Sequence, residues 1–404
     1  MNTPAEAPLQ VCHFGLRFSP NVGDGIISEC LEHGLRTIEP DLRFRPVDIS
    51  GRTAFGERTV PARRLVMSAL DRLPQAVRHV VVRGRLDALL RRVGPSWDNA
   101  AKAADVVVVG GGQILADRDL NFPKKIARVF EATARSGSPV AIHAAGAASD
   151  WSREGEKLFS TWRTARLVHV SFRDAASLSV WRERFADGDG PDACISRDPG
   201  LLAQACYGMR AADPDAPYGL GICDPGVLRY HGTGDDVPGV NTFAETAQAI
   251  ASRGRSVLLF CNGAMEDRRA LDATFEATRG SAHAHAITRA EPPRTPADLA
   301  GIVESVRAVA AHRLHACIVA YAAKRPVVGL AWDPKLDAFL DSIGAPAPIH
   351  GLSPVEIADS LQEAVRNGVD ATAHANAVAE AQDGIAVMLD ALRGAVRSTK
   401  RTPS

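Results

Sequence analysis

The sequence lacks any run of about 18 apolar residues, the length that a membrane-spanning helix needs. The first eight residues, 1–8, also lack the apolar core of a secretory signal. No internal repeat is strong enough to name, and low-complexity tracts are absent. We therefore expect a globular cytoplasmic protein with no membrane span.

The chain also has no formal excess of either charge. The chain has 47 Lys and Arg residues and 47 Asp and Glu residues, so its formal net charge is zero. This balance argues against a broad surface for polyanions, although a local basic cleft is compatible with it. We expect no nucleic-acid partner.

The seven cysteines form no Cys-x-x-Cys pair. They are scattered and odd in number, and most lie in apolar stretches, as reduced core thiols do. This pattern favours a reducing cytoplasm over a disulfide scaffold or a zinc site. His283 and His285 form a His-x-His pair, but no cysteine or carboxylate stands at ligand spacing, so we expect no metal site.

Short apolar segments alternate with helix-like segments along the chain. The predicted strands cover residues 10–14, 105–109, 139–144, 167–172, 193–196, 219–223, 257–261, 306–310 and 326–331. Buried strands separated by helices are typical of a parallel sheet that is covered on both faces. Because 404 residues exceed what one core usually organises, two doubly wound α/β domains are expected.

The predicted domain boundaries follow from this alternation. They are a disordered N-terminus at 1–8, a Rossmann-like domain at 9–207, a polar linker at 208–218, a second Rossmann-like domain at 219–370, a helix at 371–396 and a disordered tail at 397–404. Residues 41–64 are rich in Arg, Pro and Gly and predict a long surface loop. Ligands of such sheets bind beyond the carboxyl ends of the strands, which predicts a cleft between the domains.

The strongest chemical signal is Arg313-Leu314-His315-Ala316, which follows an apolar stretch and opens a predicted helix. A helix start favours bound anions, arginine offers a fork for phosphate or carboxylate, and histidine exchanges protons near neutral pH. Two other interpretations stay open: Arg313 paired with a carboxylate at the helix start, and His315 as a core residue. The motif indicates an anion-handling, proton-transferring site.

Basic residues also follow other predicted strands. Arg173 is the second candidate for anion binding, unless it forms a salt bridge with Asp174. Asp174 binds substrate or simply caps the helix toward Ser177. Lys335 neutralises phosphate as a point charge or is a solvated lysine at a helix start.

Two further motifs are candidates for ligand contact. Gly110, Gly111 and Gly112 end a valine-rich strand and permit close approach of a ligand or of another backbone. They do not form G-x-G-x-x-G, so no dinucleotide is inferred. Asn21 and Asp24 either line the site, with Asp24 polarising an acceptor hydroxyl, or form a turn and helix cap.

Taken in order, these motifs resemble those of the polysaccharide pyruvyl transferase family. The similarity extends from about Asn21 to Gly344. It rests on Asn21-Val22-Gly23-Asp24, Asp105 to Gly112, Arg173-Asp174 with Ser177, Asp198-Pro199, Arg313-Leu314-His315-Ala316 and Lys335. Gly25, Gln113 and the arginine-rich 41–64 segment depart from the family pattern in the N-terminal half, where the acceptor is expected.

The resemblance implies a two-lobed fold like that of the GT-B glycosyltransferases. It implies transfer of a pyruvyl group from phosphoenolpyruvate to two hydroxyls of a saccharide, with release of phosphate and without metal or cofactor. The implied catalytic residues are His315, Arg313 and Arg173. The implied substrate-binding residues are Asn21, Asp24, Gly110, Gly111, Gly112, Asp174 and Lys335.

Two alternatives remain. The first is a nucleotide-sugar glycosyltransferase, which needs a carboxylate pair for the ribose; Glu356 and Glu363 form the nearest pair after the motif, in a predicted surface helix. The second is a redirected family member that acts as a binding subunit. Whether the chain forms a homo-oligomer is left open by the sequence.

Overall fold

The computed structural model describes residues 7–56, 75–117, 119–186, 188, 190–231, 238–351 and 353–400. The chain divides into two compact units. The first unit contains Met1–Phe18, Leu31–Asp198 and Asp383–Ser404, and the second contains Ser19–Cys30 and Pro199–Gln382. Residues 208–218 lie inside the second unit. Of the segments predicted to be disordered, 1–6 and 401–404 lie outside the described residues.

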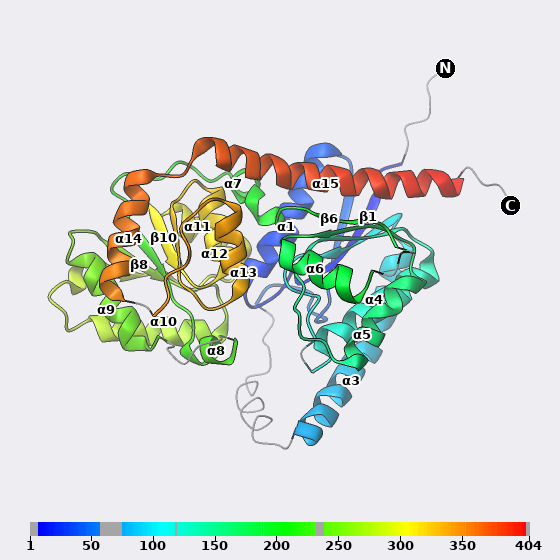
Figure 1. Ribbon diagram of the computed structural model, residues 1–404, viewed down its shortest axis with the longest axis horizontal. Helices are drawn as coiled ribbons and strands as arrows, with labels where there is room; N and C mark the ends of the chain where they lie inside the picture. The colour runs from blue at the N-terminus through cyan, green and yellow to red at the C-terminus, as the bar shows by residue number, and fades with distance from the viewer. Residues whose placement is uncertain are drawn as a thin grey trace. The chain divides into compact units, whose positions relative to one another are not determined.

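The first unit is built on a parallel six-stranded sheet with the order β2-β1-β3-β4-β5-β6. The strands are β1 (Gln10–Gly15), β2 (Arg43–Asp48), β3 (Val106–Gly110), β4 (Val140–Ala145), β5 (Leu167–Phe172) and β6 (Ala193–Ile195). The helices are α3 (Gln75–Lys102), α4 (Asn121–Ser136), α5 (Arg153–Phe159), α6 (Ala175–Arg184) and the short 3-10 helix η1 (Ser160–Thr164). Helices pack around this sheet (Figure 1).

Burial explains the centre of this sheet. Every residue of β3 and β4 is buried, as expected for largely apolar strands covered on both faces. Aromatic side chains fill the space between sheet and helices, among them Phe14, Trp97 and Phe130. The edge strand β2 corrects the predicted 41–64 loop, because Arg43–Asp48 pairs along the whole of β1. Residues 57–64 of that loop lie outside the described residues.

The second unit is built on a parallel five-stranded sheet with the order β11-β10-β7-β8-β9. Its strands are β7 (Tyr218–Gly221), β8 (Val257–Phe260), β9 (Ile287–Arg289), β10 (Ala308–Ala311) and β11 (Val327–Gly329). Its helices are α7 (Ala203–Tyr207), α8 (Pro225–His231), α9 (Val240–Ala251), α10 (Met265–Thr278), α11 (Pro296–Glu304), α12 (Leu314–Ala322), α13 (Pro334–Ser342) and α14 (Pro354–Asn367), with 3-10 helices η2 (Pro199–Leu202) and η3 (Ala284–Ala286). Figure 1 shows these helices around the sheet.

Two helices contain residues of both units. Helix α1 (Val22–Ile38) begins in the second unit and ends in the first, and α15 (Ala371–Lys400) does the same. Because α15 continues through 397–400, those residues are helical rather than part of the predicted disordered tail. Within the described ranges, we find no helix whose length and apolarity suit it to span a membrane.

Candidate functional site

Arg313 lies at the N-cap of α12, directly after β10 and His312. Its backbone carbonyl accepts the N–H groups of Ala316, at 3.0 Å, and Cys317, at 3.3 Å, which closes the first turn of the helix. The strand therefore delivers the arginine to the carboxyl edge of the sheet, as the motif predicts. The helix begins one residue later, so its positive end lies beside the guanidinium.

The guanidinium of Arg313 forms a bidentate ion pair with Asp267. Nε donates to Oδ2 at 3.1 Å, and Nη2 donates to Oδ1 at 2.9 Å and to Oδ2 at 2.7 Å. Asp267 is fully buried near the start of α10, and its Oδ1 also accepts the backbone N–H of Asp224 at 2.9 Å. The sequence left open whether Arg313 pairs with a carboxylate, and the structure shows that it does. Among the described residues, Nη1 has no hydrogen-bond acceptor.

Trp332 lies against the other side of the guanidinium. The Arg313 Cζ is 5.5 Å from the centroid of the Trp332 ring, within reach of a cation–π interaction. Burial by itself lowers the pKa of Arg313, but Cys223 and Asp267 raise it, and the net shift is upward. Burial also raises the pKa of the Cys223 thiol. Arg313 therefore stays charged and is held in one orientation from two sides.

His315 follows in the first turn of α12 and contacts the Asn21-Val22-Gly23-Asp24 segment. Its Nδ1 is 3.6 Å from Oδ1 of Asp24. Gly23 fits directly against the imidazole, because a Cβ at this position would lie 2.6 Å from the Cβ of His315. His315 is 8% exposed, and the Asp24 carboxylate is a charged group close to its Nδ1.

The same segment is fixed by the backbone of the second unit. The N–H of Val22 donates to the carbonyl of Asn262 at 3.0 Å, immediately after β8. Asn21 is next to Asp24, with 3.5 Å between its Nδ2 and Oδ1 of Asp24. Asp24 lies in the first turn of α1, so the predicted turn over 21–25 is a helix start. The structure thus brings Asn21 and Asp24 together with Arg313 and His315.

Lys335 lies in the first turn of α13 in the second unit. Its Nζ donates to Oδ2 of Asp333 at 2.7 Å, and its backbone N–H donates to Oδ1 at 3.1 Å. Asp333 is the N-cap of this helix. The lysine charge is thus neutralised locally by the capping aspartate.

In the first unit, the glycine run allows two backbone segments to meet. A Cβ on Gly110 would lie 2.2 Å from the carbonyl oxygen of His143 on β4. Gly111 and Gly112 have φ angles of 81° and 75°, in the left-handed region that favours glycine. Gly112 accepts the N–H of Gly146 at 2.9 Å. Of the two predicted uses of this run, the close approach of another backbone is what the contacts show.

Arg173 follows β5 in the first unit and is 6% exposed at its side chain. Its Nε is 3.5 Å from Oδ2 of Asp174, and its Nη1 is 3.8 Å from Oδ2 of Asp198. Its buried Nη2 has no hydrogen-bond acceptor among the described residues. Gly146 lies at the same nitrogen, since a Cβ there would be 2.8 Å away. Two carboxylates therefore position the arginine while one of its donors stays unsatisfied.

Asp174 is the N-cap of α6. Its Oδ1 accepts the backbone N–H of Ser177 at 2.7 Å. The hydroxyl of Ser177 in turn accepts the N–H of Ala147 at 2.9 Å. The capping interpretation of Asp174 and Ser177 is therefore confirmed, and the pair also fixes the loop after β4.

Neither other constellation weighed in the sequence forms a competing site. In the part of the chain that the structure describes, no group of three His, Cys, Asp or Glu side chains is suited to hold a metal ion. Glu356 and Glu363 are both exposed on α14. As a pair on a surface helix, they do not form an enclosed grip for a ribose.

Asp267 is the functional residue that sequence reasoning missed. It lies in the first turn of a helix that the sequence predicts, two residues after an exposed Met265. Its pattern is that of an ordinary acidic residue near a helix N-terminus. Only the pairing with Arg313, 46 residues later, gives it a different role.

Two Rossmann-like units with charged residues after their strands define a protein of GT-B-like fold. The chain belongs to the polysaccharide pyruvyl transferase family, whose model matches residues 21–334. This match confirms the family suggested by the ordered motifs. No curated protein sequence matches the chain.

Solved structures of distant sequence share this fold. A Listeria monocytogenes protein described as a UDP-N-acetylglucosamine 2-epimerase has 14% identity and a TM-score of 0.56, covering 99% of both chains. MnaA from S. aureus, in a co-structure with UDP, has 10% identity and a TM-score of 0.53, covering 98% of this chain and 99% of that one. A UDP-forming trehalose-phosphate synthase from Burkholderia vietnamiensis has 12% identity and a TM-score of 0.50, with the same coverage. The predicted GT-B-like fold is confirmed.

Proposed function

We propose that the protein transfers a pyruvyl group from phosphoenolpyruvate to two hydroxyls of a saccharide and releases phosphate. The observation that carries this proposal is the start of α12, where Arg313 and His315 each face a carboxylate. A fixed cation and a histidine at one helix end suit a substrate that is anionic and must be protonated. Family membership supports the class of reaction.

Arg313 is proposed to hold an anionic group of phosphoenolpyruvate. Asp267 occupies Nε and Nη2, so the remaining Nη1 edge is the part directed to substrate. A charge-assisted hydrogen bond of this kind contributes about 1.5–3 kcal/mol. The N-terminal N–H groups of α12 supply further donors for the same anion.

His315 is proposed to deliver the proton, with Asp24 beside it to stabilise the imidazolium. The carboxylate lies 3.6 Å from Nδ1 and orients the ring. Gly23 leaves space for the imidazole, because a Cβ at that position would lie 3.1 Å from its Nδ1. In this proposal Asp24 acts on His315 rather than on an acceptor hydroxyl.

The bonds balance without a cofactor. A proton adds to the methylene carbon of phosphoenolpyruvate, and the neighbouring carbon becomes cationic. One acceptor hydroxyl attacks that carbon and loses its proton, and the carbon–oxygen bond to phosphate breaks. A second hydroxyl then attacks, loses its proton and closes the cyclic ketal. Of the two hydroxyl protons, one restores the His315 acid and the other leaves on phosphate. Arg173 is proposed as a second cation for the negatively charged substrates, supported by its unsatisfied Nη2.

A cytoplasmic location is part of the proposal. All seven cysteines are free thiols, and Cys12, Cys30, Cys223, Cys261 and Cys317 are buried. Free thiols are the usual state in a reducing compartment.

Calorimetric titration of phosphoenolpyruvate tests the donor. We expect saturable binding to the wild type and none to the double variant Arg313→Ala with Asp267→Ala, which removes both halves of the pair and leaves no orphaned charge. Arg366→Ala, at an exposed arginine of α14, is the control and should bind normally. Urea unfolding of each variant verifies that it is folded.

Competing ligands separate this proposal from the alternative chemistry. Binding of a UDP-sugar without binding of phosphoenolpyruvate would favour a glycosyltransferase. Phosphate release from phosphoenolpyruvate that depends on an added saccharide diol would establish the transfer, and binding without any such release would point to a redirected family member.

A further inference from the structure

Helix α3 has an exposed stripe that contains cations and no acidic residue. The exposed positions between 81 and 102 recur at helical spacing, and the charged residues among them are Arg85, Arg91, Arg92 and Lys102. The exposed positions between these cations include the small residues Gly84, Ala88 and Ser96. Arg85 and Arg92 are seven residues apart, about 10 Å along one face of a helix. Small side chains therefore lie beside the arginines along this exposed face of α3.

The charge of this region contrasts with the neutrality of the chain. Residues 81–102 of α3 carry five Lys or Arg and two Asp, and α4 carries four Lys or Arg and one Glu, a net of six positive charges. The whole sequence has a formal net charge of zero. A chain with no net charge can still contain a local basic region, and α3 and α4 together form such a region.

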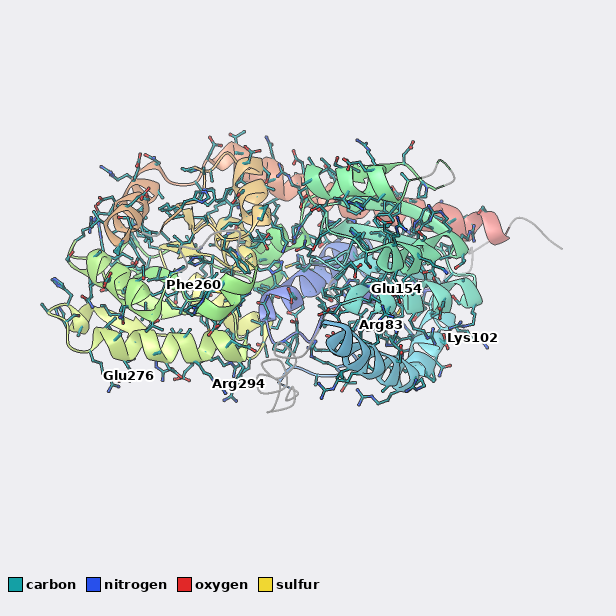
Figure 2. The ribbon with its side chains drawn as sticks, turned by 60° about the horizontal axis from the view of Figure 1, so that its bottom comes forward. Arg83, Lys102, Glu154, Phe260, Glu276 and Arg294 are labelled. Atoms are coloured by element: carbon teal, nitrogen blue, oxygen red, sulfur yellow. The ribbon has the colours of Figure 1, made fainter. Side chains whose placement is uncertain are left out.

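The acidic side chains of α3 are already used within the helix pair. Asp87 binds Lys124 at 2.6 Å, and Asp98 binds both Arg128, at 2.7 Å, and Arg135, at 2.6 Å. Nearby, Arg83 pairs with Glu154 of α5, as Figure 2 shows. No ion pair engages Arg85, Arg91 or Arg92 within the described ranges. Three cations of the stripe are left for an external partner.

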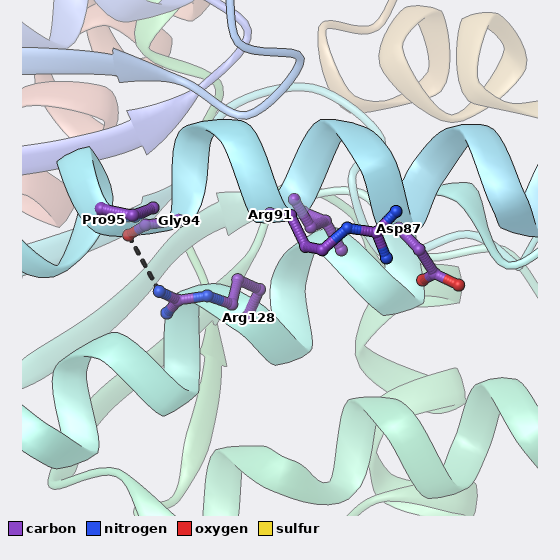
Figure 3. A pocket seen from close by; sticks show the side chains of 6 residues that line it. Asp87, Arg91, Gly94, Pro95 and Arg128 are labelled. Carbon is purple, nitrogen blue, oxygen red and sulfur yellow. Dashed lines mark hydrogen bonds between the residues drawn. The ribbon is translucent and has the colours of Figure 1, made fainter.

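A groove of about 350 Å³ adjoins the stripe between α3 and α4 (Figure 3). It is lined by Asp87, Leu90, Arg91, Gly94, Pro95 and Arg128. Arg128 donates to the carbonyl of Gly94 at 2.8 Å, which holds one wall in place. Leu90 and Pro95 provide an apolar wall beside the Arg91 cation. This combination suits a ligand that has both an apolar ring face and an acidic group.

Several partners of other classes fit this surface less well. Single-stranded nucleic acid is usually held by exposed aromatic side chains, and the described part of α3 and α4 exposes none, since Trp97 and Phe130 are buried. Insertion into a membrane needs a row of large apolar side chains, and Val81 is the one exposed example on these helices as described. Arginine forks at intervals along a shallow track match carboxylates at intervals along a polymer.

We propose that α3 and the adjoining groove bind an acid-bearing saccharide chain, namely the pyruvylated polymer that the reaction produces. This inference rests on the proposed function, because each ketal formed adds one carboxylate to the saccharide. The unmodified polymer lacks these ketal carboxylates. A surface of this kind retains a chain that has already been modified and keeps its next unit available to the same enzyme molecule.

The test is binding of the purified protein to an immobilised polysaccharide that carries pyruvyl ketals on otherwise neutral sugars. The comparison polymer is the same material after mild acid has removed the ketals. We expect binding to the ketal polymer, weakened by salt, and little binding to the stripped polymer. The triple variant Arg85→Glu, Arg91→Glu and Arg92→Glu should bind about tenfold more weakly or worse, since three exposed pairs become repulsive.

The control is a triple variant with the same change in net charge, Arg229→Glu, Arg279→Glu and Arg366→Glu, at exposed arginines of the second unit. It should bind like the wild type. Equal losses in both triple variants, equal binding of the stripped polymer, or tighter binding of single-stranded RNA or of anionic vesicles would overturn the surface assigned here.

The two proposals fail in different ways. The binding measurement contains no phosphoenolpyruvate, so a protein that binds the ketal polymer through α3 but never releases phosphate would refute the proposed function alone. A protein that releases phosphate with an acceptor present, and whose α3 triple variant binds the ketal polymer normally, would refute the surface alone.

Discussion

Arg313 and Asp267 behave as one chemical group. The aspartate is fully buried and the arginine side chain is 16% exposed, so neither charge is well solvated without the other. This pairing reduces the net charge that the site offers to an anion. It also fixes the guanidinium before substrate arrives, which lowers the entropic cost of binding.

A double-mutant cycle measures this coupling. We expect Arg313→Ala to lower the free energy of unfolding by about 3–5 kcal/mol, because it leaves Asp267 buried and unpaired. Asp267→Ala should cost a similar amount for the converse reason. The double variant should lose much less than the sum of the two, as measured by urea denaturation. Additive losses would show that the pair is not a unit.

Asp24 should affect turnover more than the affinity for phosphoenolpyruvate. Replacing it with asparagine keeps the shape but removes the charge 3.6 Å from His315. We expect kcat to fall while the dissociation constant of phosphoenolpyruvate stays the same, because the imidazole loses the carboxylate that orients it. Asn21→Ala is the comparison variant, and an unchanged kcat in Asp24→Asn would remove Asp24 from the proton-transfer step.

The sequence predicted Arg313 and His315 as neighbours because they are two positions apart at one helix start. It did not predict the partners, since Asp24 is far away in the sequence and Asp267 looks like an ordinary helix-start acid. Carboxylate pairing of this kind depends on which strands become neighbours in a sheet. That information lies in the topology and not in any local pattern.

Among the elements, the β3–β4 contact depends on glycine at position 110. A Cβ on Gly110 would lie 2.2 Å from a backbone oxygen of β4, which has no flexible end to move. We expect Gly110→Ala to cost about 1–3 kcal/mol or more in unfolding free energy. Gly137→Ala, at a left-handed residue with open space around it, should cost about 1 kcal/mol. Equal costs would contradict the close approach of the strands.

The strands also carry buried histidines that stay neutral. Burial lowers the pKa of His13 to about 4, and burial lowers the pKa of His143 and of His312 to about 3. All three rings are at most 1% exposed. The ordinary pKa of histidine is 6.5. Below that pH the unfolded chain therefore binds protons at these histidines that the folded chain does not bind.

Stability should therefore fall as the pH decreases from 6.5 toward 4. Each of these histidines contributes a slope of about 1.4 kcal/mol per pH unit in that window. His312→Leu should reduce the slope, and it removes a ring whose two nitrogens have no hydrogen-bond partner in the described structure. Urea midpoints at pH 7 and pH 5 provide the measurement. An unchanged slope in His312→Leu would mean that this ring titrates normally.

The sequence located most strands of both sheets but missed β2 and the three-residue β9, which are both edge strands. Pro46 and two arginines make Arg43–Asp48 look like a loop, yet β2 is an edge strand, where one side of the backbone needs no strand partner. The sequence did not predict helix α3, because Gly84, Gly94 and Pro95 interrupt its helical pattern. Packing of Arg128 against Gly94 accommodates that interruption.

For the whole molecule, the important fact is that Ser19–Cys30 belongs to the second unit. Val22 bonds Asn262, and the hydroxyl of Tyr207 donates to Glu29 at 2.8 Å. We expect a fragment of residues 199–382 to unfold at a higher midpoint when a peptide of residues 19–38 is added. The same peptide with Gly23→Leu should have no effect, because its side chain meets His315. Stabilisation by both peptides would contradict the assignment.

The division of the chain also sets the timing of folding on the ribosome. The second unit needs its early segment as well as residues up to Gln382, and the first unit needs residues after Asp383. Many proteins finish an N-terminal domain while the remainder is still being translated. Here the second unit has all of its residues only when synthesis has passed into α15, and the first unit only when α15 has been synthesised. The nascent chain thus carries both sheets without the helix that completes their units, a period in which chaperones have exposed surface to cover.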